Sequence, residues 1–152
     1  MDVKYLLRKK ESANHIGIGP EQLLTDAVRL MMQHRIGSLV VTEGDRLVGI
    51  ISERDVMRAA DDYLDRIRDV QVQDVMTPDP VTCTAEMTID EAMDTLLHNA
   101  TGNRIRHLPV LSDGQLVGVI SIGDIIQALL TETRFENRLL KHYIKNWPEE
   151  DA

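Results

Sequence analysis

The apolar residues of this chain follow two periods, one typical of helices and one typical of strands. Between residues 23 and 31 they recur three or four positions apart, which predicts an amphipathic helix. Two apolar runs follow at 36–41 and 47–51, and the turn-forming residues Glu43-Gly44-Asp45 between them predict a pair of strands. A β-prone piece at 15–18 precedes this helix, and a second helix is predicted from Ser52. The predicted order is β-α-β-β-α.

The second half of the chain carries the same order of patterns. A β-prone piece at 81–83 precedes a helical pattern at 89–96. Apolar runs at 105–110 and 116–120 then flank the turn residues Ser112-Asp113-Gly114. A further helix is predicted from Ser121, in the position that Ser52 holds in the first half.

Residue identities show that the two halves are copies. Nine of the twenty positions in 36–55 are identical to the corresponding positions in 105–124. A polar insertion at 101–104 accounts for the greater length of the second copy. Self-similarity of this kind indicates an internal duplication. The predicted fold class is therefore α/β (α+β), with tandem β-α-β-β-α repeats related by pseudo-two-fold symmetry.

The size of the copies predicts how they are assembled. Each copy has about 55 residues, too few for a confident independent core, so each small sheet is expected to bury one face against its twin. The second strand of each pair is apolar on both faces and is predicted to be central in its sheet. The predicted segments are a first repeat with its N-terminal segment at 1–68, a linker at 69–80, a second repeat at 81–130 and a C-terminal helical extension at 131–152.

Composition and charge narrow the class of protein. The chain has 17 basic and 25 acidic residues, a net charge of −8, which disfavours binding to DNA or RNA. Cys83 is the single cysteine, so an intrachain disulfide and a cysteine-based zinc site are excluded. The first residues lack the apolar segment of a signal peptide, and no apolar run reaches the length of a transmembrane helix. A cytoplasmic protein without a membrane partner is expected.

A Ser-x-x-Asp motif stands where the last strand of each copy turns into a helix. It is present as Ser52-Glu53-Arg54-Asp55 and as Ser121-Ile122-Gly123-Asp124. One interpretation is a capping box, in which the serine and the acid satisfy the free N–H groups of the helix start. The other is a ligand site, because a helix N-terminus suits a phosphate and an adjacent Asp can accept the hydroxyls of a ribose. The sequence leaves both interpretations open.

The residues that begin the first strand of each pair differ between the copies. The second copy has Arg106-His107, and the first has Gly37-Ser38 at the same place. A guanidinium there could bind phosphate oxygens, or it could be a solvated surface group. Conversely, Arg54 of the first copy corresponds to Gly123 in the second. The two sites are therefore predicted to be inequivalent.

No catalytic or metal-binding group is evident in the sequence. Gly17-Ile18-Gly19 is followed by Pro20 and lacks the third glycine of a dinucleotide fingerprint. The five histidines show no paired metal-ligand spacing, and neither motif serine has a histidine partner in its motif. The chain is not expected to be an enzyme, and no cofactor or metal is predicted to be required.

These patterns together resemble the CBS (cystathionine-β-synthase) domain pair, also called a Bateman module. The resemblance covers about residues 3–130 and rests on Ile105-Arg106-His107-Leu108-Pro109-Val110, on Leu116-Val117-Gly118-Val119-Ile120-Ser121-Ile122-Gly123-Asp124, on their first-copy equivalents and on the linker Asp74-Val75-Met76-Thr77. It implies two clefts between the repeats that bind adenosine-containing ligands. The candidates are AMP, ADP, ATP and NAD, with S-adenosylmethionine as a further one.

The resemblance also implies which residues line each cleft. Asp55 and Asp124 each hold a ribose, with Ser52 and Ser121 near the phosphates. The Asp124 cleft is completed by Ile36, Gly37, Arg106, His107 and Val119. The Asp55 cleft is completed by Ser38, Ile50, Arg54, Thr82, Met87, Ile105 and Arg106, with apolar side chains beside adenine and Arg54 on phosphate. Because Gly37-Ser38 and Gly123 depart from the pattern, one cleft is expected to bind weakly or stay empty.

The function predicted is a non-catalytic sensor of adenine nucleotides that regulates another protein in trans. A homodimer is expected, formed by helical faces at 27–31 and 92–96. One alternative is a ligand-free assembly adaptor in which both Ser-x-x-Asp motifs serve only as helix caps. The other is a small enzyme that acts on a nucleotide.

Overall fold

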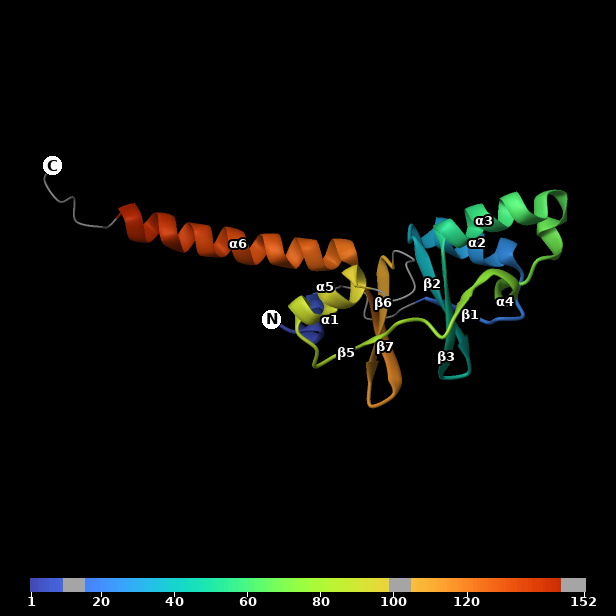
Figure 1. The fold of residues 1–152 in the computed structure, drawn as a ribbon, viewed down its shortest axis with the longest axis horizontal. Helices are drawn as coiled ribbons and strands as arrows, with labels where there is room; N and C mark the ends of the chain where they lie inside the picture. Colours follow the sequence, from blue (N-terminus) through green and yellow to red (C-terminus); the bar gives the residue numbers. More distant parts are fainter. Residues whose placement is uncertain (10–15, 99–104, 146–152) are drawn as a thin grey trace, which may run out of the picture.

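The computed structural model describes residues 1–9, 16–98 and 105–145 of the chain (Figure 1). The predicted insertion at 101–104, residue 15 of the first β-prone piece and the predicted tail at 146–152 lie outside the described residues. The first repeat contains β1 (Gly17–Ile18), α2 (Leu24–His34), β2 (Ser38–Glu43), β3 (Arg46–Ser52) and α3 (Glu53–Tyr63). The second contains β5 (Cys83–Thr84), α5 (Ile89–Leu97), β6 (His107–Ser112), β7 (Gln115–Ser121) and α6 (Ile122–Lys145). The predicted order is thus confirmed in both copies.

Each repeat builds its own small sheet. In both, the short first strand pairs in parallel with the second, and the second and third strands form an antiparallel hairpin. The hairpin turns contain Gly44 and Gly114, whose positive φ angles of 58° and 77° suit glycine. A bulge follows Val41 in β2 and Val110 in β6, at the same place in each copy. The duplication seen in the sequence therefore extends to the register of the strands.

The linker contributes structure to the first repeat. After α3 the chain forms a 3-10 helix (Leu64–Asp69), α4 (Val72–Val75) and β4 (Thr77–Pro78). Because β4 pairs with β3, the first sheet has the order β1-β2-β3-β4, whereas the second has the order β5-β6-β7. The third strand is therefore central in the first sheet, as predicted. In the second sheet the prediction is wrong for the described residues, because β7 takes the edge and α1 (Val3–Lys9) packs beside it.

The two sheets lie face to face between two layers of helices. Figure 1 shows α2 and α3 outside the first sheet, and α1, α5 and α6 outside the second. In the hairpins, Leu39 and Val41 belong to one apolar core and Leu108 and Val110 to the other. Since side chains alternate along a strand, Val40 points to the other face, where it is 1% exposed. Pro109 is buried in the same way, and β3 contacts β7, so the sheets bury these faces against each other as predicted.

The N-terminal helix α1 packs on the second repeat, although the sequence analysis grouped residues 1–9 with the first. The Val3 N–H donates to the Met87 carbonyl at 2.9 Å, and the Lys4 N–H donates to the Ala85 carbonyl at 3.0 Å. Val3 and Leu6 belong to the core of the second repeat. The second repeat is therefore built from two separate pieces of the chain.

Helix α1 is the counterpart of α4 from the linker. The Val72 N–H donates to the Gln22 carbonyl at 2.8 Å, and the Gln73 N–H donates to the Pro20 carbonyl at 2.9 Å. These are the positions in the first repeat that correspond to the α1 contacts in the second. Val72 and Val3 are both fully buried. The duplicated unit thus includes this short helix. Helix α1 lies before the first repeat in sequence but packs on the second, and α4 lies before the second repeat but packs on the first.

The helical faces predicted to form a dimer lie inside the monomer. Ala27 and Ala92 are 0% exposed, and Met31 and Leu96 are 6% and 4% exposed. All four side chains face the sheet of their own repeat, because the apolar stripe of an amphipathic helix covers its nearest core. The prediction of these residues as an intermolecular surface is wrong.

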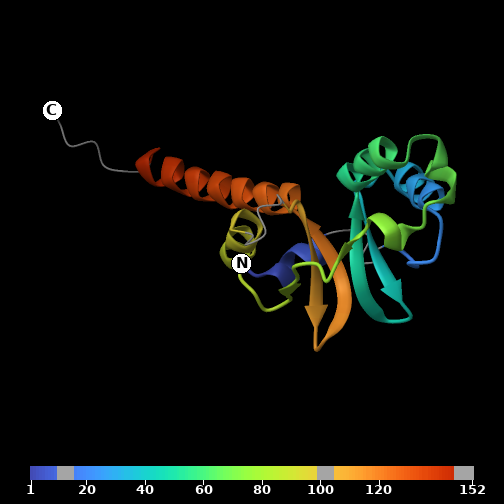
Figure 2. The same ribbon diagram turned by 45° about the vertical axis from the view of Figure 1, so that its right-hand side comes forward.

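Helix α6 runs without a break through the predicted boundary at residue 130. Its first turns pack on the body of the second repeat, where Ile125 is fully buried. The rest of the helix projects away from the body (Figures 1 and 2). Within the described ranges, no helix is both long and apolar enough to cross a membrane.

Candidate functional site

Both Ser-x-x-Asp motifs form capping boxes at the start of a helix. The Ser52 N–H donates to Asp55 Oδ2 at 2.8 Å, and the Ser121 N–H donates to Asp124 Oδ2 at the same distance. The Asp124 N–H also donates to Ser121 Oγ at 3.1 Å. A strand that delivers its last residue in extended conformation leaves the first N–H groups of the helix open, and these side chains satisfy them. The capping interpretation is therefore confirmed for both motifs.

The two aspartates differ in what else surrounds them. Asp55 is 6% exposed, and its Oδ1 lies 3.8 Å from the Arg58 guanidinium. Asp124 is half-buried and lines a hollow of about 210 Å³ between α1 and α6. Pockets for whole drug-sized ligands start at about 300 Å³, so this hollow can take only part of a nucleotide as it stands.

The hollow beside Asp124 includes residues that the sequence analysis did not single out. Lys9 and Tyr5 come from α1, and Gln127 and Thr131 come from α6. The Lys9 ammonium lies 4.9 Å from the centre of the Tyr5 ring, a cation–π contact at the rim of the hollow. No signal in the sequence could place Lys9 near Asp124, because the docking of α1 on the second repeat was not predicted.

Most residues predicted for the Asp124 cleft are brought together. His107 pairs with Ser121 across β6 and β7, and the Ile122 N–H donates to the Arg106 carbonyl at 2.8 Å. Val119 lies two residues before Ser121 on β7 and faces the other sheet. The Arg106 side chain is exposed at the entrance of β6.

Gly37 brings the first repeat into this group. A methyl group on Gly37 would lie 3.7 Å from His107 Cε1 and 2.8 Å from Glu53 Oε1. The two repeats therefore meet between Gly37 and His107, beside the start of α6. The neighbouring Ile36 packs on the core of the first repeat.

The residues predicted for the Asp55 cleft fall into two groups. Ser38 pairs with Ser52. Ile50 precedes Ser52 on β3, and Arg54 and Asp55 follow it on α3. Met87 and Ile105 pack against the core of the second repeat, and Thr82 lines a different hollow. The first group lies together at the start of α3. The second group contacts the core of the second repeat or lines the larger hollow instead.

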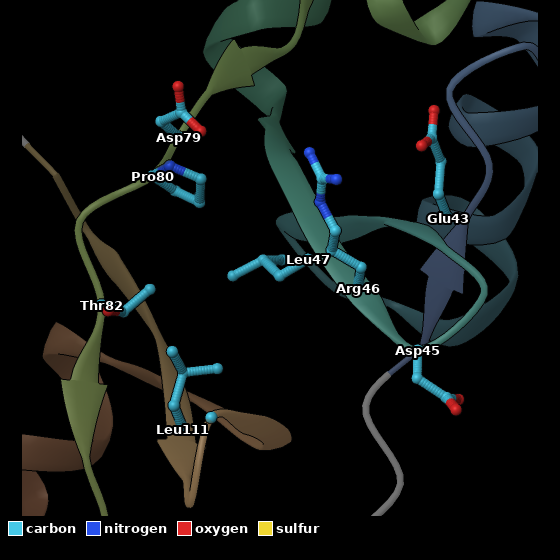
Figure 3. Close-up of a pocket in the computed structure, with 9 residues that line it drawn as sticks. Glu43, Asp45, Arg46, Leu47, Asp79, Pro80, Thr82 and Leu111 are labelled. Carbon is cyan, nitrogen blue, oxygen red and sulfur yellow. The ribbon is translucent and has the colours of Figure 1, made fainter.

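The larger hollow lies between the two hairpins, toward their turns. It measures about 570 Å³ and is lined by Glu43, Asp45, Arg46, Leu47, Asp79, Pro80, Thr82, Leu111 and Gly114. Figure 3 shows the side chains of Leu47 and Leu111 directed into the space between the repeats. Of the predicted site residues, only Thr82 is present there. This larger hollow is wide open, and its lining mixes three carboxylates with one guanidinium, so its chemistry points to no single ligand.

The described residues offer no metal centre, since no three of their His, Cys, Asp or Glu side chains are grouped to hold an ion. Burial raises the pKa of the Cys83 thiol to about 11. A thiol with a raised pKa is a poor nucleophile at neutral pH. Cys83 is a core residue of the second repeat and not part of a site.

Comparison with known proteins identifies the family. The CBS domain model matches residues 12–62 and 72–131 of the chain. The chain is 39% identical over 125 residues to the CBS domain-containing protein CBSX3, mitochondrial, of Arabidopsis thaliana, covering 79% of this chain and 59% of that protein. It is 37% identical to an inosine-5'-monophosphate dehydrogenase of Korarchaeum cryptofilum, over 72% of this chain but 21% of the enzyme. The chain thus spans about three fifths or less of the length of these two relatives.

Solved structures agree with the sequence comparisons. The crystal structure of the CBS-domain-containing protein ATU1752 from Agrobacterium tumefaciens matches with a TM-score of 0.76 at 34% identity. The match covers 84% of this chain and 98% of that one, so both repeats and their arrangement are shared. The chain belongs to the CBS domain family, as a tandem pair of CBS domains.

Proposed function

We propose that this chain is a regulatory module that binds an adenosine-containing ligand between its repeats and acts on a partner protein in trans. The observation that carries the proposal is the approach of Gly37 to His107 beside the capped start of α6. Gly37 of the first repeat meets His107 there, and His107 pairs with Ser121 at the start of α6, so a ligand bound at this point would touch both repeats. Binding would then change how the repeats sit against each other, which is the signal a partner could detect.

The chemistry at Asp124 suits a nucleotide. The start of α6 carries the positive end of a helix dipole, which favours phosphate oxygens. Lys9 of the hollow and the exposed Arg106 add two cations near that point. A carboxylate accepts hydroxyl hydrogens, so Asp124 can hold a ribose while its Oδ2 keeps the cap.

Two structural neighbours support an adenosine ligand. One is CBSX2 in complex with AMP, and the other is a CBS domain pair in complex with 5'-methylthioadenosine and S-adenosyl-L-methionine. Each is 23% identical to this chain, so the likeness itself concerns the fold. Among adenosine ligands we propose AMP, ADP, ATP and NAD first, because their phosphates use the two cations.

The two clefts are proposed to differ in occupancy. Asp55 is almost fully buried, and its carboxylate contacts Arg58 in addition to the cap. Asp124 lines an open hollow with Lys9 at its rim. We propose that the Asp124 cleft is the principal site. The burial of Asp55 favours a purely structural role for the Asp55 cleft. For that cleft alone it supports the second candidate function, a ligand-free adaptor.

The experiment measures thermal unfolding with AMP, ADP, ATP, NAD or S-adenosylmethionine at millimolar concentration, followed by calorimetric titration of the best ligand. A ligand that binds the native state must raise the midpoint temperature of unfolding. At a hundred times its Kd it adds about 2.7 kcal/mol to the free energy of unfolding. Asp124→Asn is expected to weaken binding at least tenfold, and Asp55→Asn to leave it nearly unchanged.

Glu91→Gln is the matched control, because Thr88 and Glu91 form a capping box that belongs to neither motif. It should change stability only slightly, because glutamine can still accept the Thr88 N–H, and it should leave the affinity for the ligand unchanged. Flat melts with every ligand would remove the sensor and leave the adaptor. Equal loss of affinity in Asp124→Asn and Glu91→Gln would show that only stability is being measured.

A further inference from the structure

The second half of α6 stands clear of the rest of the molecule. Ala128 and Leu129 still pack on the second repeat, but each side chain that the structure describes between residues 131 and 142 is exposed. Figures 1 and 2 show this part of the helix extending away from the body. Large apolar side chains are exposed along it, with Leu130 at 51% and Leu140 at 58%.

The sequence of this exposed half lacks the charge spacing that supports a solitary helix. Solvated helices are usually supported by opposite charges three or four residues apart. In α6 those spacings join Glu132 to Glu136 and Arg134 to Arg138, which are like charges. No acidic residue between 132 and 141 has a basic residue at either spacing. A helix of this composition therefore needs a partner surface.

Three exposed apolar residues and two uncharged polar ones lie along α6 at the spacing of a coiled-coil seam. Successive members are four, three, four and three residues apart; they are Ile126, Leu130, Thr133, Asn137 and Leu140. This is the spacing of heptad positions d, a, d, a and d. The members carry no charge, and Ile126 is already 44% exposed beside the body. The seam is thus open along its length.

The row of residues that continues the packed face of α6 is a poorer candidate. Beyond Leu129 that row runs through Glu132, Glu136 and Leu139. Two carboxylates on one contact line would repel their equivalents in a second helix. The neutral seam is the surface that a helix could cover without burying a charge.

The charges beside the seam indicate what covers it. In a parallel pair of identical helices, a residue at position g faces position e′ five residues later on the partner. Glu136 occupies g and Lys141 occupies the following e, so two opposite-charge pairs form. In an antiparallel pair, the e positions Arg134 and Lys141 would face each other and repel. The charges therefore fit a second copy of this helix, in parallel.

We infer that α6 pairs with α6 of a second copy of this chain as a parallel two-stranded coiled coil, with Asn137 facing Asn137. A polar residue at one a position fixes the register of such pairs. The pairing places the two bodies at the same end of the coiled coil. The inferred contact lies on a surface other than the clefts. If the protein is a dimer but binds no nucleotide, the coiled-coil inference holds and the proposed sensor function fails.

The stoichiometry and the seam are tested by sedimentation velocity of the full chain over a range of concentrations. The wild type is expected to be dimeric, and Leu130→Glu with Leu140→Glu is expected to raise the dimer dissociation constant at least about tenfold. Leu139→Glu is the matched control, since Leu139 is 54% exposed on the same helix but off the seam. A monomeric wild type, or a dimer equally sensitive to the control, overturns the inference.

The charge pairs and the orientation have their own tests. Glu136→Lys should weaken the dimer, and adding Lys141→Glu should restore it, because the second change re-forms the opposite-charge pairs. If either residue acted only within its own helix, the second change would not restore the dimer. In a Cys83→Ala background, Leu140→Cys should form an intermolecular disulfide on mild oxidation, because parallel in-register helices bring the same residue together. Cross-linking of Leu139→Cys but not of Leu140→Cys overturns the parallel seam.

Discussion

Leu7 of α1 packs directly on Gly118 of β7. A methyl group on Gly118 would lie 2.7 Å from Leu7 Cδ2, closer than carbon atoms approach without displacement. Met76, which follows α4, holds the equivalent place on Gly49 of β3, where a methyl group would lie 2.6 Å from its sulfur. Each repeat thus keeps a glycine in its third strand so that a side chain from the short helix can pack on the strand.

The first prediction is that alanine at either glycine destabilises the protein. Gly118→Ala should lower the free energy of unfolding by about 1 to 3 kcal/mol through overpacking, as measured by urea denaturation. Gly49→Ala should cost more than Gly118→Ala, because its methyl group also meets the Thr77 carbonyl at 3.0 Å. Backbone of β4 cannot move aside as a leucine side chain can.

Gly123→Ala serves as the control for these variants. Among the described residues its methyl group would meet only Ser121 Oγ, at 3.6 Å, and alanine favours a helix, so stability should stay equal or rise slightly. Adding Leu7→Ala to Gly118→Ala should recover part of the loss, since it removes the atom that clashes. Additive losses in this pair would contradict the packing that we describe.

The order of elements was predictable because apolar periodicity decides it. The duplicated runs at 36–41 and 105–110 carry the same alternation, and both formed hairpins with the same register and the same bulge. The helix caps were equally predictable, since Ser-x-x-Asp at a strand end has few other ways to satisfy the helix N–H groups.

The place of α1 was not predictable from the same kind of pattern. The helix has seven residues, and of its counterpart in the linker it shares mainly the buried valine, Val3 against Val72. A match of one residue is no signal in a sequence. The hollow that Asp124 shares with Lys9 depends on this docking, so those residues were missed. The prediction of the dimer faces was wrong for a related reason. Periodicity shows that a helix has an apolar face, but it does not show what covers that face.

A second prediction tests whether the space between the repeats admits a ligand. Gly37→Val places a side chain beside His107, in the predicted Asp124 cleft. The near contact is the Glu53 carboxylate, the end of an exposed flexible side chain that can move aside, so the unliganded protein should lose about 1 kcal/mol, the low end of the cost of overpacking. Nucleotide affinity measured by calorimetry should fall at least tenfold.

Gly19→Ala is the control for Gly37→Val. Of the residues that the structure describes, a methyl group there would meet only Gln22, at an ordinary 3.5 Å, and Gly19 is remote from both motifs in sequence. Its affinity for the nucleotide should equal that of the wild type. Unchanged affinity in Gly37→Val, with stability preserved, would place the ligand somewhere other than between Gly37 and His107.

A third prediction concerns alkaline pH. Cys83 on β5 is 1% exposed, and burial raises the pKa of its thiol from 9.0 to about 11. Well below pH 9 the thiol is protonated in both the folded and the unfolded chain and has no effect on stability. Between pH 9 and 11 the unfolded chain releases the proton while the folded chain retains it, so stability falls as pH rises.

The whole fall, complete only above pH 11, is expected to be about 2 to 3 kcal/mol, since each unit of pKa difference corresponds to 1.36 kcal/mol. Urea denaturation at pH 8.5, 9.5 and 10.5 measures most of it, and Cys83→Ala removes the titrating thiol while leaving every other group in place. The slope of stability against pH should therefore be steeper in the wild type than in Cys83→Ala. The difference between the two slopes is what belongs to the thiol. Parallel slopes would mean that Cys83 ionises in the fold as easily as in the unfolded chain, which its place in the core of the second repeat does not permit.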